Sequence, residues 1–316
     1  MLFKNLIISV NEQDLKIIGG KISKHVISFF RFFLMFGLSF IILYPLLYML
    51  CLAFRNPPEL LDLTVVWLSK SFTLENIKNV IRITEYPKSF LITITISVGC
   101  SLFQCFTASL TGYGFARFKF KGRNILFFGA LFTILVPPQI VMMPSYINFV
   151  NFTEYTGIPT INTIIPLIVP ALLGSGIKAG LFVIIFRQFY KNLPKELEEA
   201  AYIDGCGPWM AYWRVIVLNA GPMILVSFIL TFVWYWNDYF NVSLYYNKAQ
   251  PLALQVANLV SRMTSSLSPS GTNYTSQEMT VYSMTACLLF IIPTLIVYVF
   301  LQKKFTQSII NAGIVG

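Results

Sequence analysis

Residues 192–222 read NLPKELEEAAYIDGCGPWMAYWRVIVLNAGP and form the longest polar-rich passage between two strongly apolar segments. Asn192 is a candidate N-cap with Pro194 in the first turn, and the glutamates that follow would complement the positive end of the helix dipole. Gly205 suits a left-handed helix end, and Pro208 can open a second helix because its missing N–H needs no partner there. The stretch predicts two short helices meeting at an angle, and we call residues 192–221 the elbow.

The composition predicts that most of the chain lies in lipid. Of 316 residues, 56% are hydrophobic and 11% are charged, and the mean hydropathy is +0.69. A soluble domain cannot bury that much apolar surface. The formal charge of +10 does not indicate nucleic-acid binding, because the basic residues separate apolar runs instead of forming one face. The five cysteines show no metal or redox spacing.

Six apolar runs are long enough to cross a bilayer, which takes about twenty residues of helix. We expect breaks in the third run at Pro137-Pro138 and in the fourth at Pro170 and at residues 174–176. The fold class expected is therefore an all-α polytopic membrane protein, with a membrane domain over residues 32–302. The runs are 32–54, 89–116, 124–148, 164–186, 222–245 and 279–301; outside them lie an N-terminal arm (1–31), a mobile outer loop (246–278) and a tail (303–316).

Basic residues predict the orientation, because lysine and arginine accumulate on the cytoplasmic side of membrane proteins. With the N-terminus inside, the inner segments hold fifteen of them and the outer segments seven. Both termini and the elbow are therefore expected in the cytoplasm. The inner segments counted are 1–31, 117–123, 187–214 and 303–304; the outer ones are 55–88, 149–162 and 248–262.

Part of the elbow resembles the EAA loop of ABC-importer permeases. The resemblance rests on Glu199-Ala200-Ala201, on Gly205 after three further residues, and on residues 215–217. Where the family usually has Leu-Pro, this chain has Val217-Leu218. The resemblance implies a cytoplasmic coupling helix in a groove of an ATPase subunit. Glu199 would be its polar anchor, Ala200 and Ala201 its close-contact surface, and Gly205 its turn, with Asp204 beside them. The alternative is an amphipathic helix on the membrane surface.

Three further stretches resemble carbohydrate importers of the maltose type, in the order found there: residues 113–123, 236–239 and 307–316. The resemblance implies the type I ABC importer permease fold in a bacterial plasma membrane. It also implies a second permease subunit, two ATPase subunits that use ATP and Mg, and an extracytoplasmic binding protein that delivers a sugar or oligosaccharide. The loop 246–278 lies where that group places a segment in contact with the binding protein.

The chain lacks the residues needed to hydrolyse ATP. It has no Gly-x-x-x-x-Gly-Lys-Ser/Thr loop. Its single histidine, His25, permits neither a histidine proton relay nor a multi-histidine metal site. We therefore expect no enzyme activity, cofactor or metal in this chain, and energy supplied by a partner or an ion gradient.

Lys178 is the only charge that lies clearly inside an apolar run. It would contact the solute in the path, or serve as structural partner for polar groups of a paired permease. The cluster Trp234, Trp236, Asn237 and Asp238 could stack on and hydrogen-bond a sugar, or anchor the end of a span at the headgroup level.

Other functions remain compatible with the residues alone. One is an ABC permease for another polar solute, such as a peptide or polyamine. An ion-coupled secondary transporter would work without an ATPase, although such proteins usually bury more ionisable groups than this chain does. A membrane scaffold without a path is the third.

Overall fold

The computed structural model describes residues 12–62, 67, 69–246, 248, 250–264 and 274–314, with side chains described between residues 27 and 302 of these ranges. Throughout this part of the chain the regular structure is helical, and extended pairing is limited to one isolated bridge between Arg55 and Phe72. The prediction of an all-α fold is confirmed.

Helix α3 (Tyr86–Arg117) is the central element, and it packs against α6 (Ile165–Leu172), α7 (Ala179–Asn192) and α11 (Gly221–Trp236). Its buried face is unusually rich in small and polar residues, which let neighbouring backbones approach closely. At Gly112 an added Cβ would lie 2.6 Å from the Phe186 Cβ. Helices α3 and α7 are therefore in near-backbone contact there. The buried small and polar residues include Ser97, Ser101, Gln104, Ala108 and Ser109.

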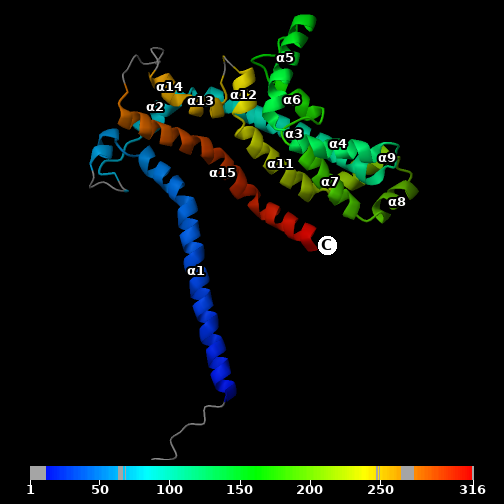
Figure 1. The fold of residues 1–316 in the computed structure, drawn as a ribbon, viewed down its shortest axis with the longest axis horizontal. Helices are drawn as coiled ribbons and strands as arrows, with labels where there is room; N and C mark the ends of the chain where they lie inside the picture. Colours follow the sequence, from blue (N-terminus) through cyan, green and yellow to red (C-terminus); the bar gives the residue numbers. More distant parts are fainter. Residues whose placement is uncertain are drawn as a thin grey trace, which may run out of the picture.

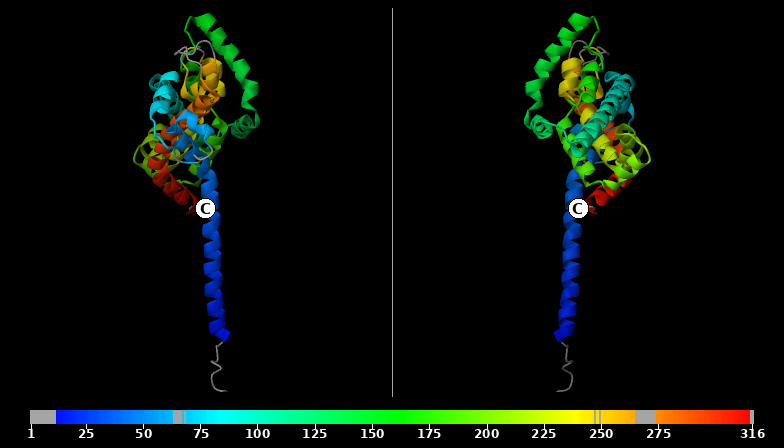
Figure 2. Two further views of the ribbon diagram at one scale, coloured as in Figure 1. Left: turned by 90° about the vertical axis from the view of Figure 1, so that its left-hand side faces the viewer. Right: turned by 90° about the vertical axis from the view of Figure 1, so that its right-hand side faces the viewer.

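Two long helices flank this centre, α1 (Glu12–Ala53) and α15 (Ser276–Ile314), which pack against each other. Figures 1 and 2 show most of α1 extending away from the other helices. Its aromatic side chains are correspondingly exposed, Phe29 by 68% and Phe32 by 66%. An apolar helix of this length with so little protein contact is suited to lipid or to a second membrane subunit.

The third and fourth apolar runs are broken, as predicted, but the prediction of a break at Pro170 is wrong, because Pro170 lies inside α6. Helix α4 (Arg123–Leu135) meets α5 (Pro138–Thr156) at 102°, and residues 173–178 separate α6 from α7. Three described helices are by themselves long and apolar enough to cross a bilayer, or up to five if each bent pair is one span. The three are Ile27–Ala53, Tyr86–Arg117 and Ser276–Gln302, and the second bent pair joins Pro208–Asn219 to Gly221–Trp236.

The end of the molecule opposite the elbow carries several short helices, and we call it the loop end (Figure 1). The prediction of a loop over 246–278 is wrong for residues 252–257 and 259–264, which form helices and bury Leu252 and Leu259 to 1% exposure each. Residues 265–273 lie outside the described part. The loop end comprises η1 (Pro57–Leu61), α2 (Glu75–Ile83), α12 (Phe240–Tyr245), α13 (Leu252–Ala257) and α14 (Leu259–Thr264).

Candidate functional site: the elbow and the broken helix

The first helix of the elbow is α8 (Glu196–Ile203), and it ends in a Schellman motif. Gly205 has φ +80°, a left-handed conformation that glycine adopts without strain. Its N–H donates to the Tyr202 carbonyl at 3.1 Å, and the Cys206 N–H donates to the Ala201 carbonyl at 2.9 Å. The predicted role of Gly205 as the helix end is confirmed.

The predicted N-cap at Asn192 is wrong, because Asn192 is the last residue of α7 and α8 begins only at Glu196. The cause is Pro194, which disfavours helical geometry at the residue before it. Leu193 is accordingly extended, with ψ 135°. Pro194 ends one helix here and does not belong to the first turn of the next.

The second arm of the elbow begins at Pro208, as predicted, with α9 (Pro208–Ala211). A π-helical turn, η2 (Tyr212–Ile216), and α10 (Val217–Asn219) follow. The chain then bends by 76° into α11. Single π turns inside helices frequently mark functional positions.

Arg117, the last residue of α3, contacts both α8 and the linker before it, and we call this pair of contacts the Arg117 clamp. Its Nε lies 2.9 Å from Oε1 of Glu198, and its Nη2 donates to the Leu193 carbonyl at 2.6 Å. The Nε–H is not directed at the carboxylate, so this contact is an ion pair without a well-aligned hydrogen bond. The two side chains are only 7% and 11% exposed. Burial raises the pKa of the Glu198 carboxyl, and the Arg117 charge partly offsets that rise.

Three tyrosines join the second arm to the helical bundle. The Ser109 hydroxyl of α3 hydrogen-bonds the Tyr190 hydroxyl of α7 at 2.6 Å and the Tyr212 hydroxyl of η2 at 2.9 Å. The ring of Tyr113 packs against both tyrosines, with centroids at 5.6 and 5.0 Å. All three rings are at most 2% exposed. The elbow is thus held to α3 and α7 by buried aromatic packing as well as by the Arg117 clamp.

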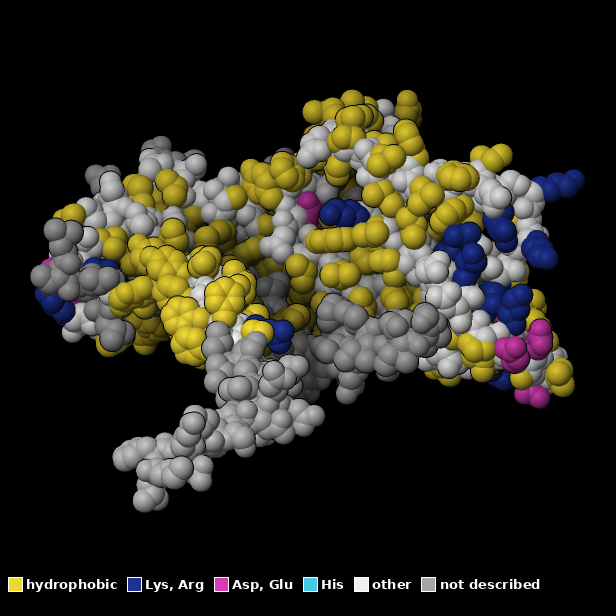
Figure 3. Space-filling view, turned by 60° about the horizontal axis from the view of Figure 1, so that its bottom comes forward, with side chains coloured by type: hydrophobic (Ala, Val, Ile, Leu, Met, Phe, Trp, Pro, Cys, Tyr) yellow, Lys and Arg dark blue, Asp and Glu magenta, His cyan; other side chains and the backbone are white. Residues whose placement is uncertain are grey.

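The predicted coupling residues divide between exposed and buried positions. Glu199, Ala200, Asp204 and Gly205 are exposed. Ala201 is only 4% exposed, so its prediction as a close-contact surface is wrong: it packs inward on the same side of α8 as Glu198. Ile203 and Trp209 add exposed apolar surface, at 86% and 60%. Figure 3 shows Lys and Arg side chains gathered at the elbow end, with acidic side chains beside them.

The break between α6 and α7 is stabilised by side chains of α3 and α11. Gln104 donates to the Ile177 carbonyl at 2.7 Å, and the Tyr235 hydroxyl donates to Gln104 Oε1 at 2.7 Å. The same hydroxyl accepts the Ile177 N–H at 3.2 Å, and Thr107 donates to the Leu172 carbonyl at 2.8 Å. Irregular backbone at membrane depth is tolerated only when its polar groups are satisfied in this way.

Lys178 lies at this break and precedes α7, with φ +51°. Its ammonium group is 4.5 Å from the centroid of the Trp234 ring, a cation–π contact. The lysine is exposed and the indole half-buried. The structure therefore brings together two of the five residues that the sequence predicts for a solute path.

The other three are held in different surroundings. Trp236 is 1% exposed, and its indole N–H donates to the Phe290 carbonyl at 3.1 Å, so it is a core residue. The Asn237 amide donates to the Val233 carbonyl one turn back, at 2.8 Å. Asp238 accepts from the backbone and side-chain N–H groups of Asn241, at 3.1 and 2.9 Å, and fixes the start of α12.

Sequence reasoning missed the residues that hold the site together. Glu198 lies inside the quoted stretch and Arg117 inside the basic turn, but nothing in their spacing along the chain pairs them. Gln104 and Tyr235 lie in apolar runs far apart in sequence. A polar amide within a predicted span was the available signal, because such groups need partners in lipid.

Comparison with known proteins gives consistent results. Residues 104–311 match a family described as binding-protein-dependent transport system inner membrane component. The arabinooligosaccharides transport system permease protein AraQ of Halalkalibacterium halodurans is 28% identical over 88% of this chain and 93% of its own. The polygalacturonan/rhamnogalacturonan transport system permease protein YtcP of Bacillus subtilis is 26% identical over 91% and 96%. A chain of a bacterial ABC transporter that imports the acidic polysaccharide alginate shares the fold, with TM-score 0.71, 21% identity and coverage of 90% and 98%.

Proposed function

This chain belongs to the family of binding-protein-dependent transport system inner membrane components, and we propose that it is the permease subunit of an ATP-driven ABC importer for a sugar or oligosaccharide. In this proposal it forms half of the translocation path in a bacterial plasma membrane. A second permease forms the other half, and an extracytoplasmic binding protein delivers the solute. The proposal extends family membership to a substrate class and a set of partners.

The printed names of the relatives support the substrate class. Arabinooligosaccharides and polygalacturonan or rhamnogalacturonan are named for two relatives that align over most of this chain. A relative from Yersinia enterocolitica, 27% identical over 71% of this chain, is named as an sn-glycerol-3-phosphate transport system permease protein. A second candidate function is therefore import of another small polar solute by the same machinery.

The observation that carries the coupling mechanism is the geometry of α8. The helix presents Glu199 and Ala200 to solvent while Glu198 and Ala201 hold its other side to the protein. A short exposed helix held by a buried ion pair can transmit force, because it cannot move without moving α3 or breaking that pair. We propose that two ATPase subunits, which bind ATP and Mg, seat α8 in a groove, and that their closure tilts the spans between inward- and outward-facing states.

The rival interpretation of α8 as a membrane-surface helix fits its exposed side less well. Interfacial helices carry lysine and arginine on the polar face and a broad apolar face towards the acyl chains. Outside its buried side, α8 exposes Glu196 and Glu199 with the adjoining Asp204, and its large exposed apolar side chains, Tyr202 and Ile203, lie only in the last turn and form no broad apolar face. Carboxylates favour a protein groove over the anionic surface of a cytoplasmic leaflet.

We place the solute path beside the break between α6 and α7. Lys178 and Trp234 lie against each other there at the level of a broken helix. An indole face stacks on sugar rings, and an ammonium group hydrogen-bonds hydroxyls or an acidic substituent. Trp236, Asn237 and Asp238 support the fold around this point.

Charge reversal at Glu199 tests the coupling role. We expect Glu199→Lys to abolish uptake of radiolabelled arabinooligosaccharide in cells that express the complete importer, while the chain stays in the membrane at normal amounts. The matched control is Glu154→Lys on α5, which reverses an exposed glutamate away from the elbow and should leave uptake unchanged.

Normal uptake by the Glu199→Lys importer would reject the coupling role. An ion-coupled secondary transporter makes a different prediction: this chain alone in vesicles would move solute under an ion gradient, with no ATPase present.

A further inference from the structure

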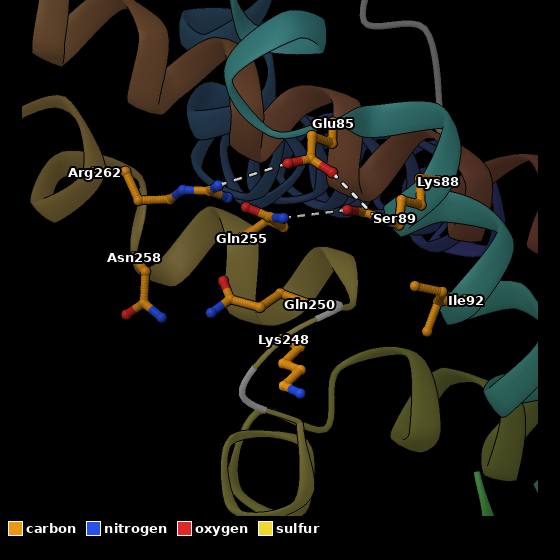
Figure 4. A pocket seen from close by; sticks show the side chains of 9 residues that line it. All are labelled: Glu85, Lys88, Ser89, Ile92, Lys248, Gln250, Gln255, Asn258 and Arg262. Carbon is orange, nitrogen blue, oxygen red and sulfur yellow. Dashed lines mark hydrogen bonds and ion pairs between the residues drawn. The ribbon is translucent and has the colours of Figure 1, made fainter. Parts of the chain in front are cut away.

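A polar pocket of about 340 Å³ opens at the loop end, on the far side of the molecule from the elbow. Figure 4 shows its lining, which comes from two parts of the chain: Glu85 with the first two turns of α3, and the segment from Lys248 to α14. Pockets of roughly 300–1,000 Å³ hold small molecules. Neither the elbow nor the helix break contributes a residue to it.

The charge of the lining is positive. Lys88, Lys248 and Arg262 face a single carboxylate, Glu85. Glu85 lies 3.6 Å from the Lys88 ammonium and 4.0 Å from Arg262, and its side chain is 53% exposed. Exposed pairs at these distances contribute little. Without counting Arg262, two lysines line the pocket and Glu85 is the only acidic residue in its lining, so the pocket favours an anionic ligand group.

The floor of the pocket presents amide groups with unused acceptors. Gln255 is 3% exposed, and its side-chain N–H group donates to the Ser89 hydroxyl at 3.3 Å. Its Oε1 is buried and has no hydrogen-bond partner among the described residues, and the same holds for Oε1 of Gln250. A buried acceptor without a partner is rare in folded proteins. Hydroxyl donors from a ligand would satisfy both oxygens.

We propose that this pocket binds a hydroxylated anion, with its acidic group between Lys88 and Lys248 and its hydroxyls on Gln250 and Gln255. Two sources carry that chemistry: a sugar acid in the medium, and the glycerol phosphate headgroup of phosphatidylglycerol. The pocket is a second site, separate from the solute path, and its existence does not depend on the importer function proposed above.

The test measures binding to the full-length chain in nanodiscs of phosphatidylcholine. Galacturonate is the first probe and galactose its neutral counterpart, so the pair differs in the carboxylate alone. Lys88→Ala and Lys248→Ala each remove one cation, and we expect each to weaken galacturonate binding about tenfold, as for loss of one charge-assisted hydrogen bond. Lys78→Ala, at an exposed lysine of α2 outside the pocket, is the matched control.

The second arm replaces part of the phosphatidylcholine with phosphatidylglycerol and measures, by native mass spectrometry, how much of it stays bound to the chain. Loss of this lipid in Lys88→Ala and Lys248→Ala, with retention in Lys78→Ala, supports the proposal with lipid as the source. Gln255→Leu should weaken whichever ligand binds and leave the chain folded by circular dichroism.

Three results would overturn the proposal. The first is the absence of binding by both galacturonate and phosphatidylglycerol. The second is equal binding of galactose and galacturonate, which would remove the role of charge. The third is an equal loss of ligand binding in Lys78→Ala and in the pocket variants, which would show that the net charge of the chain, and not the pocket, determines binding.

Discussion

Removal of the carboxylate at Glu198 should loosen the elbow from the bundle. In Glu198→Ala the guanidinium of Arg117 would remain buried without its counter-ion, because both side chains are about nine-tenths inaccessible. Breaking a buried pair from one side destabilises by about 3–5 kcal/mol. We therefore expect the attachment of α8 to weaken while the distant helices keep their stability.

The lower end of that range follows from the structure. Two unit charges about 4 Å apart attract by roughly 4 kcal/mol at an effective dielectric constant near 20. Arg117 also keeps its hydrogen bond to the Leu193 carbonyl, which offsets part of the loss. A cost of about 3 kcal/mol would raise the fraction of detached elbow about a hundredfold. Replacing both charges, as in Arg117→Leu with Glu198→Leu, should recover most of it, because a well-packed apolar pair is often as stable as a buried ion pair.

Hydrogen exchange followed by mass spectrometry measures this detachment locally. Peptides covering residues 193–206 should lose about a hundredfold of protection in Glu198→Ala, and Glu198→Gln should also lose protection, because the neutral amide keeps the shape of the side chain but removes the counter-ion of Arg117. Peptides from α15 should not change in either variant. Unchanged elbow protection in Glu198→Ala would refute the clamp, and loss spread evenly over the chain would show that the pair serves global stability.

The remaining predictions concern the turn and the tryptophans. Gly205→Ala should reduce elbow protection by about 1 kcal/mol, from backbone strain at φ +80°, although its Cβ would meet open space; an unchanged exchange profile would contradict this. Trp236→Ala should lower the free energy of unfolding, measured by thermal denaturation, by about 3–5 kcal/mol. Trp234→Ala should chiefly reduce solute uptake. If Trp234→Ala destabilised the protein and Trp236→Ala reduced only uptake, the two assigned roles would be wrong.

Local chemistry made parts of this fold predictable from sequence. The left-handed turn at Gly205, the helix start at Pro208 and the break at Pro137-Pro138 depend on residues whose backbone preferences are strong enough to prevail in any surroundings. The membrane class follows from composition in the same way, because a water-soluble fold of this chain could not bury all of its apolar residues. The placement of the two termini relative to the cytoplasm stays a prediction.

Tertiary contacts decide the features that the sequence did not reveal. Ala200 and Ala201 are chemically identical neighbours, and only the packing of α8 against the second arm of the elbow, η2 and α9, determines that one is exposed and the other is buried. Trp234 and Trp236 lie two residues apart on one helix and therefore point in different directions, one to Lys178 and the other to the core. Residues 252–264 belong to a polar stretch of sequence, but they form helices because their leucines are buried against the rest of the protein.

The contacts of α3 suggest how motion of the elbow would reach the solute path. Along this one helix, Arg117 holds α8, Ser109 holds Tyr212 of the second arm, and Gln104 holds the break before Lys178. These attachments span 13 residues of a continuous helix, which is about 20 Å at 1.5 Å per residue. A helix transmits displacement over that distance without needing a relay of loops. Any force that moves α8 must therefore move α3 or break a buried pair, and moving α3 strains the hydrogen bonds that keep the α6–α7 break in place.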